Sequence, residues 1–300
     1  MLGVTIIKGV VFVVDVVHTV VFSYEQGGGN PCPVVLGAEH YSTEEMQAMA
    51  KAFMQETAFV CPPADPECDF KLRYFVPFHE MGMCVHATIG CATVLVRKGM
   101  AQKSPIRFET QLGMVSVEWT RRGEEIDVAV AQFLPTFSDK NPAAQEVCKA
   151  LGISAEALGP YPIQSVATSR QKLMVPLKDR ETLDSLQPNF EYLWQLCDDY
   201  DTTGFYPFSP GQTGDGTLVF FARQFPKRAG YDEDPATGVA ASALGAYLIE
   251  TVGLSTQQGW NSFKILQGFA MGKPSIITSE IYLEGDKITA TRIKGNAELQ

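Results

Sequence analysis

Clustered basic residues are scarce in this 300-residue sequence, which has 24 Lys and Arg against 34 Asp and Glu and a formal net charge of -10. Binding to nucleic acid or to an anionic membrane surface requires clustered Lys and Arg that neutralise phosphates. The sequence therefore argues against both kinds of partner. A small anionic substrate is still possible, because its binding depends on the local field of one cleft rather than on the net charge.

Metal-binding spacings are also lacking. The seven cysteines form no CxxC, and together with the four histidines they form no Cys/His metal pattern. An odd, scattered set of cysteines is typical of reduced thiols in a cytosolic protein. We therefore expect a cytoplasmic protein without a structural zinc or another metal.

An uninterrupted apolar run of membrane-spanning length is missing from the N-terminus. The stretch VTIIKGVVFVVDVVHTVVF, residues 4–22, is broken by Lys8, Asp15 and His18. A charge at the bilayer centre costs roughly 2.5–3.5 kcal/mol on insertion scales, and a Val-rich run with polar interruptions favours strands. It also lacks the small-residue cleavage site of a signal peptide. We expect it to form the first strand of a soluble protein.

The remaining pattern is many short strands joined by turns, with few helices. Ser42 followed by Glu45 predicts a capped helix start, and the stretches ETAFVCPP and FKLRYFVPF predict strands. Two helices of mostly small residues lie about half a chain apart, at HATIGCATVL (86–95) and PATGVAASAL (235–244). Such a pattern predicts an α+β fold with curved antiparallel sheets, in two similar halves with one central helix each.

Two explanations fit the small-residue helices. Small side chains let a surrounding sheet approach on all sides, and the free N–H groups of an enclosed helix N-terminus could bind a substrate carboxylate. Alternatively, the small residues only ease packing, and Asp234 is only an N-cap residue. The stretch 230–250 by itself leaves both open.

Five motifs carry a family resemblance: GNPCPVV, QETAFV, HATIG, EDPATG and ILQGFAMGKPS. In order and spacing they resemble the phenazine-biosynthesis isomerase (PhzF-like) family, which shares the diaminopimelate epimerase fold, from about residue 11 to the end. The resemblance implies two pseudo-symmetric halves, each a curved, mostly antiparallel sheet wrapped round a central helix, with the active site in the cleft between them. We place the halves at residues 1–122, with a returning strand at 287–300, and at 123–286. The family uses no organic cofactor or metal, and homodimers are usual.

The resemblance places the family's proton-shuttling glutamate at Glu56. A carboxylate that both takes and returns a proton must be held partly out of water, so that its pKa rises towards neutrality. The apolar neighbours Ala58, Phe59 and Val60 suit that setting. A solvated Glu at a helix end is the alternative.

The other site residues follow from the same motifs. Asp234 matches the family's second carboxylate, and His86 matches a histidine that hydrogen-bonds in its neutral form. Asn30 resembles a substrate-contacting asparagine, although an Asn-Pro turn is an equally good explanation. A substrate carboxylate or oxyanion would lie against backbone amides near His86 and Gly238, so Ala87, Gly238 and Val239 complete the expected binding set. No metal ligand is expected.

Three residues depart from the family pattern or compete with it. Val85 replaces the glycine before the histidine, and Val239 replaces a hydroxyl-bearing serine, so the phenazine substrate itself is not expected. Cys84 raises the possibility of a two-thiol mechanism like that of related epimerases. No cysteine lies between residues 198 and 300 to act as a partner, so Cys84 is expected to be a small buried thiol.

The sequence thus predicts a cofactor-independent isomerase or epimerase that moves a proton on a small carboxylate-bearing substrate. The competing hypothesis is a non-catalytic binding or interaction protein that keeps the fold, because fold does not fix function. The substrate, and the choice between epimerisation and a double-bond shift, are left open.

Overall fold

The computed structural model describes residues 3–7, 10–254 and 256–300. The chain forms two compact units, an N-terminal unit of residues 1–23, 30–131 and 294–300 and a C-terminal unit of residues 24–29 and 132–293. The division lies beyond the expected residue 122 because two strands on either side of that point pair as an antiparallel hairpin, with Val117 opposite Val130. The two strands of the hairpin therefore stay in one unit.

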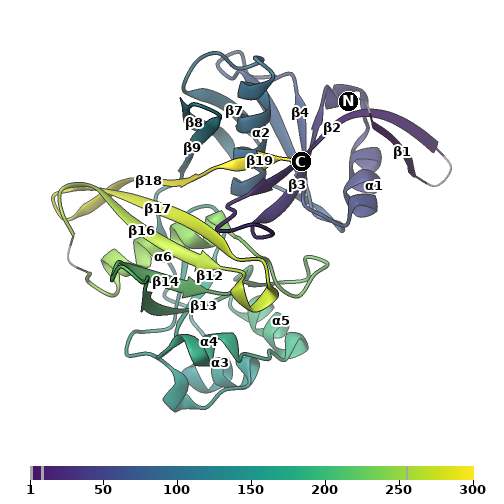
Figure 1. Cartoon of the computed structure of the whole chain (residues 1–300). Coiled ribbons are helices and arrows are strands. Elements are labelled where there is room, and N and C mark those ends of the chain that lie inside the picture. The colour runs from purple at the N-terminus through teal and green to yellow at the C-terminus, as the bar shows by residue number, and fades with distance from the viewer. Residues whose placement is uncertain (1–2, 8–9, 255) are drawn as a thin grey trace. The chain divides into compact units, whose positions relative to one another are not determined.

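The N-terminal unit is built mainly of strands, with two α-helices (Figure 1). Its elements are β1 (Gly3–Ile7), β2 (Val10–Val21), β3 (Asn30–Leu36), a 3-10 turn (Ala38–His40), α1 (Thr43–Phe53), β4 (Thr57–Cys61), β5 (Phe70–Phe75), β6 (Glu80–Met81), α2 (Val85–Arg97), β7 (Ile106–Thr110), β8 (Gly113–Arg122), β9 (Glu125–Gln132) and β19 (Ala297–Leu299).

Strands of this unit pair mostly in antiparallel fashion. The hydrogen-bonded order runs β19, β2, β3, β4, β5, β7, β8, β9, with parallel pairing at β3–β4 and β5–β7. Residues Val85–Val96 of α2 are all buried, and the helix contacts β2, β3, β4 and β19. The enclosed helix expected from the small residues is therefore present.

The N-terminal stretch forms two strands, so the expectation of one strand is corrected. β1 and β2 pair antiparallel, with Ile7 opposite Val10. Residues on both sides of Lys8-Gly9 prefer strand, and this preference by itself does not separate one long strand from two. Among the residues that the structure describes, no helix has the length and apolarity needed to cross a membrane.

Helix α1 begins as the sequence predicts. The Ser42 hydroxyl accepts from the Glu45 N–H at 3.2 Å, and the Ser42 N–H donates to the Glu45 carboxylate at 2.8 Å. This capping box fixes the helix start. Met46 and Met49 then face a small core with Phe59 of β4.

The C-terminal unit contains more helix than the N-terminal unit. Its elements are β10 (Thr136–Phe137), α3 (Ala144–Leu151), a 3-10 turn (Ala155–Ala157), β11 (Gln164–Ala167), β12 (Lys172–Pro176), α4 (Arg180–Asp184), α5 (Phe190–Asp199), β13 (Gly204–Gln212), β14 (Leu218–Ala222), β15 (Phe225–Pro226), α6 (Gly238–Glu250), β16 (Gly259–Gln267), a 3-10 turn (Phe269–Met271), β17 (Ser275–Glu284) and most of β18 (Lys287–Gly295).

This unit repeats the plan of a buried helix against a sheet. The strand order is β10, β11, β12, β13, β14, β16, β17, with parallel pairing at β12–β13 and β14–β16. Residues Gly238–Leu248 of α6 are all buried, and α6 contacts β11, β12, β16 and β17. Helices α3, α4 and α5 add a separate core against β13. The mixed α/β architecture agrees with the predicted fold class.

Glycines explain why the two central helices are made of small residues. A Cβ atom on Gly90 of α2 would lie 2.8 Å from the hydroxyl of Thr19 on β2, and a Cβ on Gly245 of α6 would collide with the Ser279 hydroxyl of β17. Contacts this short are not tolerated in a packed interior. Packing of the sheet against each helix therefore requires glycine at these positions.

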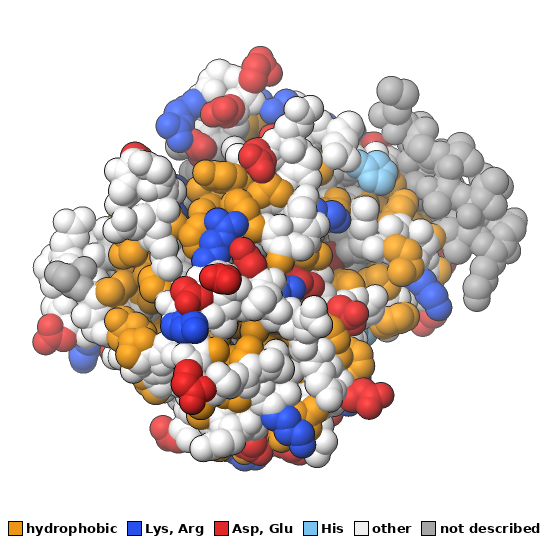
Figure 2. All heavy atoms as spheres, turned by 60° about the horizontal axis from the view of Figure 1, so that its bottom comes forward, with side chains coloured by type: hydrophobic (Ala, Val, Ile, Leu, Met, Phe, Trp, Pro, Cys, Tyr) orange, Lys and Arg blue, Asp and Glu red, His pale blue; other side chains and the backbone are white. Residues whose placement is uncertain are grey.

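Charged side chains are interspersed on the surface. Figure 2 shows one face, on which Lys and Arg lie among Asp and Glu rather than gathering into a basic patch.

Candidate active site

Glu56 lies where the chain leaves α1 and enters β4. All five residues of β4 are buried, and the Glu56 side chain keeps only 12% of its surface exposed. A buried strand directly after it therefore holds the carboxylate mostly out of water. The alternative of a solvated glutamate at a helix end is wrong on this point.

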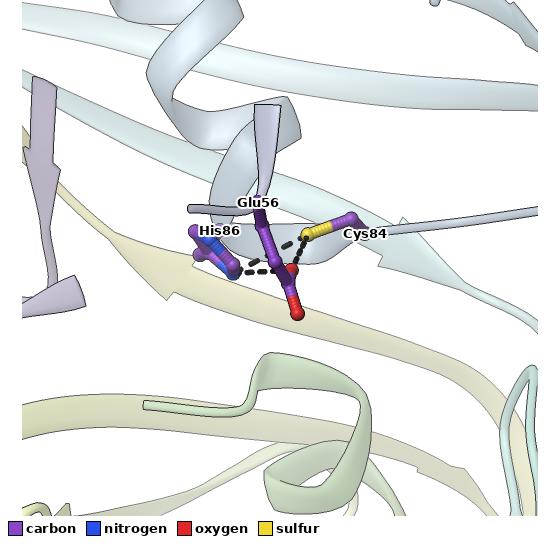
Figure 3. Close-up of side chains that lie close together, drawn as sticks. All are labelled: Glu56, Cys84 and His86. Atoms are coloured by element: carbon purple, nitrogen blue, oxygen red, sulfur yellow. Dashed lines mark hydrogen bonds and ion pairs between the residues drawn. The ribbon is translucent and has the colours of Figure 1, made fainter. Parts of the chain in front are cut away.

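Three side chains converge at this position (Figure 3). The Cys84 thiol donates to Glu56 Oε2 at 3.0 Å, and Cys84 Sγ lies 3.3 Å from His86 Nδ1. His86 Nδ1 is 3.6 Å from the same Glu56 oxygen. Cys84 is the N-cap residue of α2 and His86 lies in its first turn, so the start of the helix positions both.

Burial sets the protonation of the two neighbours of Glu56. Desolvation and the nearby Glu56 carboxylate raise the pKa of Cys84 well above its usual range. Desolvation lowers the pKa of His86, although Glu56 acts in the opposite direction. Both groups are therefore neutral near pH 7, and burial is the main cause.

The single thiol proton can serve only one acceptor. When Cys84 donates to Glu56, the Nδ1–H of His86 donates to Cys84 Sγ. His86 Nε2 then carries no proton and is an acceptor. His86 Nε2 is buried and has no hydrogen-bond partner among the described residues. A buried polar atom without a partner costs about 1–3 kcal/mol, so this nitrogen is suited to a group that arrives with a ligand.

The other predicted residues of this unit are buried as well. Asn30 is the first residue of β3 and pairs with Val21. Ala87 lies in the first turn of α2 and is buried. Val85 is the first residue of the helix and is buried.

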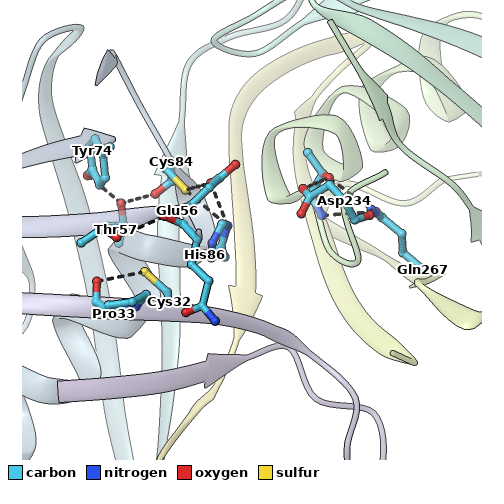
Figure 4. Close-up of polar contacts among 12 residues, drawn as sticks. Cys32, Pro33, Glu56, Thr57, Tyr74, Cys84, His86, Asp234 and Gln267 are labelled. Carbon is cyan, nitrogen blue, oxygen red and sulfur yellow. Dashed lines mark hydrogen bonds and ion pairs between the residues drawn. The ribbon is translucent and has the colours of Figure 1, made fainter. Parts of the chain in front are cut away.

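Asp234 belongs to a second polar cluster, in the C-terminal unit (Figure 4). The Thr237 hydroxyl donates to Asp234 Oδ2. The Gln267 amide donates to the Asp234 carbonyl at 2.6 Å and to the Thr237 hydroxyl at 3.1 Å. Its oxygen accepts from the Tyr206 hydroxyl at 2.9 Å and from the Thr237 N–H at 3.2 Å. All four hydrogen bonds available to a side-chain amide are therefore made.

This cluster joins two of the motifs that carry the family resemblance. Gln267 comes from ILQGFAMGKPS and Asp234 from EDPATG. Gly268, which directly follows Gln267, has φ +82°, and a Cβ there would lie 2.7 Å from the Pro235 carbonyl oxygen. Only glycine allows the two loops to pack so closely.

The N-cap of α6 is Thr237, so Asp234 is not the helix cap. The sequence alternative that gave Asp234 only this role is therefore wrong. Gly238 is the first residue of the helix and Val239 the second, and both are buried. Asp234 itself is only 6% exposed.

Sequence reasoning missed four residues of these clusters, namely Cys84, Tyr206, Thr237 and Gln267. Cys84 was expected to be a small buried thiol; it is buried, but its contacts with Glu56 and His86 were not foreseen. Thr237 and Gln267 lay inside quoted motifs without an assigned role. One sequence signal could have pointed to Gln267. It is a polar residue directly before a glycine, and the glycine marks a tight turn.

Known proteins of similar sequence or structure match almost the whole chain. An uncharacterized isomerase of Clostridium acetobutylicum is 30% identical over 280 residues, covering 92% of this chain and 92% of that protein. A PhzF-family phenazine biosynthesis protein from Bacillus anthracis has a similar crystal structure, with a TM-score of 0.85 and 26% identity over 95% of this chain and 96% of that one.

A more distant solved structure shares the fold alone. The hydroxyproline epimerase of Agrobacterium vitis has a TM-score of 0.65 and 13% identity, with 96% of this chain and 90% of that one covered. The sequence profile of the family described as phenazine biosynthesis-like protein (PhzC-PhzF) matches residues 19–300. The chain therefore belongs to the PhzC-PhzF family of phenazine biosynthesis-like proteins.

Proposed function

We propose that this protein is a cofactor-independent isomerase or epimerase that moves a proton on a small carboxylate-bearing substrate. Family membership and relatives named as isomerases support the reaction class. The observation that carries the proposal is the Glu56 carboxylate, 12% exposed, beside the Cys84 thiol and the His86 ring.

Glu56 is the proton carrier in this proposal. Its Oε2 already accepts a hydrogen bond from the Cys84 thiol, so the carboxylate is held in place before a substrate binds. A positioned acid or base contributes about 10²–10⁴ in rate. Carbon-acid substrates are appropriate, because a desolvated carboxylate is a stronger base than a solvated one.

Backbone amides near His86 would hold the charge that develops on the substrate. The neutral His86 ring offers Nε2, which lacks a partner in the described part of the chain, as an acceptor for a donor group of the substrate. Amides in the first turns of α2 and α6, at Ala87 and Gly238, are the donors for a carboxylate or an enolate-like oxygen. Fixed donors of this kind often supply the largest catalytic contribution.

Asp234 acts on the same substrate in the proposal, as the family resemblance implies. It would orient the substrate's amino or hydroxyl group or share a proton with His86. Asn30 and Val239 would contact the substrate. The bonds from Thr237 and Gln267 support the role, because they fix the residue before any ligand binds.

A binding protein without catalysis is the second candidate. The observation that favours it is the burial of Val85 and Val239, at 2% and 3% exposure, in the first turns of the two central helices. Each adds apolar bulk where the family carries glycine or serine. A protein of this kind would bind carboxylates without exchanging their hydrogens.

Deuterium wash-in from D₂O tests the proposal. Wild type, Glu56→Gln and the control Glu124→Gln, an exposed residue in the β8–β9 turn, are incubated with amino, hydroxy and unsaturated carboxylic acids, and exchange is read by mass spectrometry. We expect one substrate class to exchange with wild type and the control, with a loss of at least about 100-fold in Glu56→Gln. Equal exchange by Glu56→Gln would remove Glu56 from the mechanism, and carboxylate binding without exchange would favour the second candidate.

The homodimer comes from the resemblance alone, and the cytoplasmic location from the scattered cysteines. We propose a cytoplasmic homodimer, and sedimentation equilibrium of the purified chain gives the mass of the assembly directly. A monomer mass at all concentrations would contradict it.

A further inference from the structure

The three convergent atoms of the Glu56 cluster have the spacing of metal ligands. Cys84 Sγ lies 3.0 Å from Glu56 Oε2 and 3.3 Å from His86 Nδ1. The third distance, from His86 Nδ1 to Glu56 Oε2, is 3.6 Å. In a tetrahedral Zn²⁺ site with bonds of about 2.0–2.3 Å, two ligand atoms lie roughly 3.3–3.7 Å apart. One point can therefore lie at bonding distance from all three atoms after shifts of a few tenths of an ångström.

The kinds of donor select the metal. Thiolate, imidazole and carboxylate are the three side-chain ligands that Zn²⁺ uses in proteins. Mg²⁺ and Ca²⁺ require oxygen ligands and would not be held by a thiolate and an imidazole. Three protein ligands also leave a fourth position for water, as in mononuclear zinc sites that remain open to ligands.

Electrostatics favours a divalent cation at this position. Glu56 brings one negative charge into a site where Cys84 and His86 are buried. On binding, the Cys84 thiol loses its proton to solvent and coordinates as thiolate, while His86 carries its ring proton on Nε2. The two negative charges then balance the charge of Zn²⁺, so the buried cluster becomes neutral overall. The 12% of the Glu56 side chain that is exposed gives the ion access.

We propose that Glu56, Cys84 and His86 form a Zn²⁺ site, one per chain, and that the bound metal inhibits the protein. Inhibition rests on the proposed function: a Glu56 oxygen that is bonded to zinc can no longer accept a proton from carbon. Zinc is then a regulator or an inhibitor of this site and not its cofactor.

Competition between the full-length protein and a chromophoric zinc chelator tests the site. Wild type, Cys84→Ser and Cys148→Ser are stripped of metal and titrated with Zn²⁺. Cys148 is a matched control, because it is a buried free thiol in the C-terminal unit. We expect one Zn²⁺ per chain for wild type and Cys148→Ser, and an affinity at least about 100-fold weaker for Cys84→Ser, since even outer-shell changes cost 10–100-fold.

Co²⁺ provides a second readout that does not depend on affinity. Wild type loaded with Co²⁺ should show a thiolate-to-cobalt charge-transfer band that disappears in Cys84→Ser and is retained in Cys148→Ser. Circular dichroism of each metal-free variant establishes that it is folded, and His86→Gln, which should also weaken Zn²⁺ binding, replaces Cys84→Ser if that variant does not fold.

The outcomes separate the metal site from the isomerase proposal. Equal Zn²⁺ affinity in wild type and Cys84→Ser, or no binding by wild type, overturns the site. Zn²⁺ binding that leaves deuterium exchange unchanged at saturation overturns inhibition. Zn²⁺ binding that depends on Cys84, together with no deuterium exchange on any substrate, supports the metal site. The same result counts against the isomerase function but not against the metal site.

Discussion

Replacement of Gln267 by Leu should lower the free energy of unfolding of the C-terminal unit, because the hydrogen bonds of Gln267 are lost. The Gln267 amide is fully buried and makes four hydrogen bonds. Leu has a similar size but cannot replace any of them. The Tyr206 hydroxyl and the Thr237 N–H would then be buried donors without their present acceptor.

The cost can be worked out from those two donors. Each buried donor without a partner costs about 1–3 kcal/mol, so Gln267→Leu should lower the free energy of unfolding by about 2–6 kcal/mol. Tyr206→Phe alone removes one bond, and the Gln267 oxygen keeps the Thr237 N–H, so this change should cost only about 0.5–1.5 kcal/mol. In the double variant the orphaned hydroxyl is gone and only the Thr237 N–H lacks its acceptor. The cost of the double variant should therefore be smaller than the sum of the two single costs by about 1.5–4.5 kcal/mol.

Urea unfolding of wild type, Gln267→Leu, Tyr206→Phe and the double variant measures how far the two effects depart from additivity. Trp194 and Trp260, two of the three tryptophans, lie in the C-terminal unit and report its unfolding by fluorescence. Tyr74→Phe is the control, because Tyr74 bonds Thr88 in the other unit and should combine with Gln267→Leu additively within about 0.5 kcal/mol. Additivity for Tyr206→Phe as well would refute the hydrogen-bond assignment.

Two further predictions concern the N-terminal unit. Gly90→Val should lower the free energy of unfolding by at least about 1 kcal/mol, because the new Cβ would lie 2.8 Å from the Thr19 hydroxyl. Thermal unfolding measures this loss. The control Gly214→Val should change the stability little, because a Cβ at that position would meet no other atom. A larger loss in Gly214→Val would contradict the packing argument. The Lys71 ammonium and two backbone N–H groups lower the pKa of Glu109 from its ordinary 4.5 to about 2. A lowered pKa stabilises the fold above pH 4.5 and loses that effect towards pH 2, so wild type should exceed Glu109→Gln in stability by a constant amount above pH 5, and the gap should close on acidification. A gap that does not depend on pH down to 2 would show that this ion pair does not contribute.

Much of the fold could be predicted because it depends on local patterns. The capping box at Ser42 and Glu45 needs only residues three apart, and it is present as expected. Runs of small residues predicted that α2 and α6 are enclosed, and the burial of both helices confirms it. The Val-rich N-terminus was correctly assigned to strand, but the break between β1 and β2 was not located.

The candidate site could be predicted only in part. The motifs pointed to Glu56, His86 and Asp234, and the structure brings Glu56 and His86 together. The same motifs gave no role to Cys84, although it contacts both. Metal-ligand spacing read along the chain also missed the cluster, because Glu56 is 28 residues from Cys84.

Sequence alone determined which residues form enclosed helices, which segments form strands and which family the motifs resemble, because these depend on side-chain size, periodicity and short spacings. Tertiary structure alone decided that Cys84 lies against Glu56 and that Gln267, 33 residues further along the chain, holds Asp234. Contacts of this kind depend on the register of strands and on the point where a helix begins. A shift of one residue turns a strand side chain to the opposite face of the sheet, so a site assembled from separate segments is defined only when the whole fold has formed.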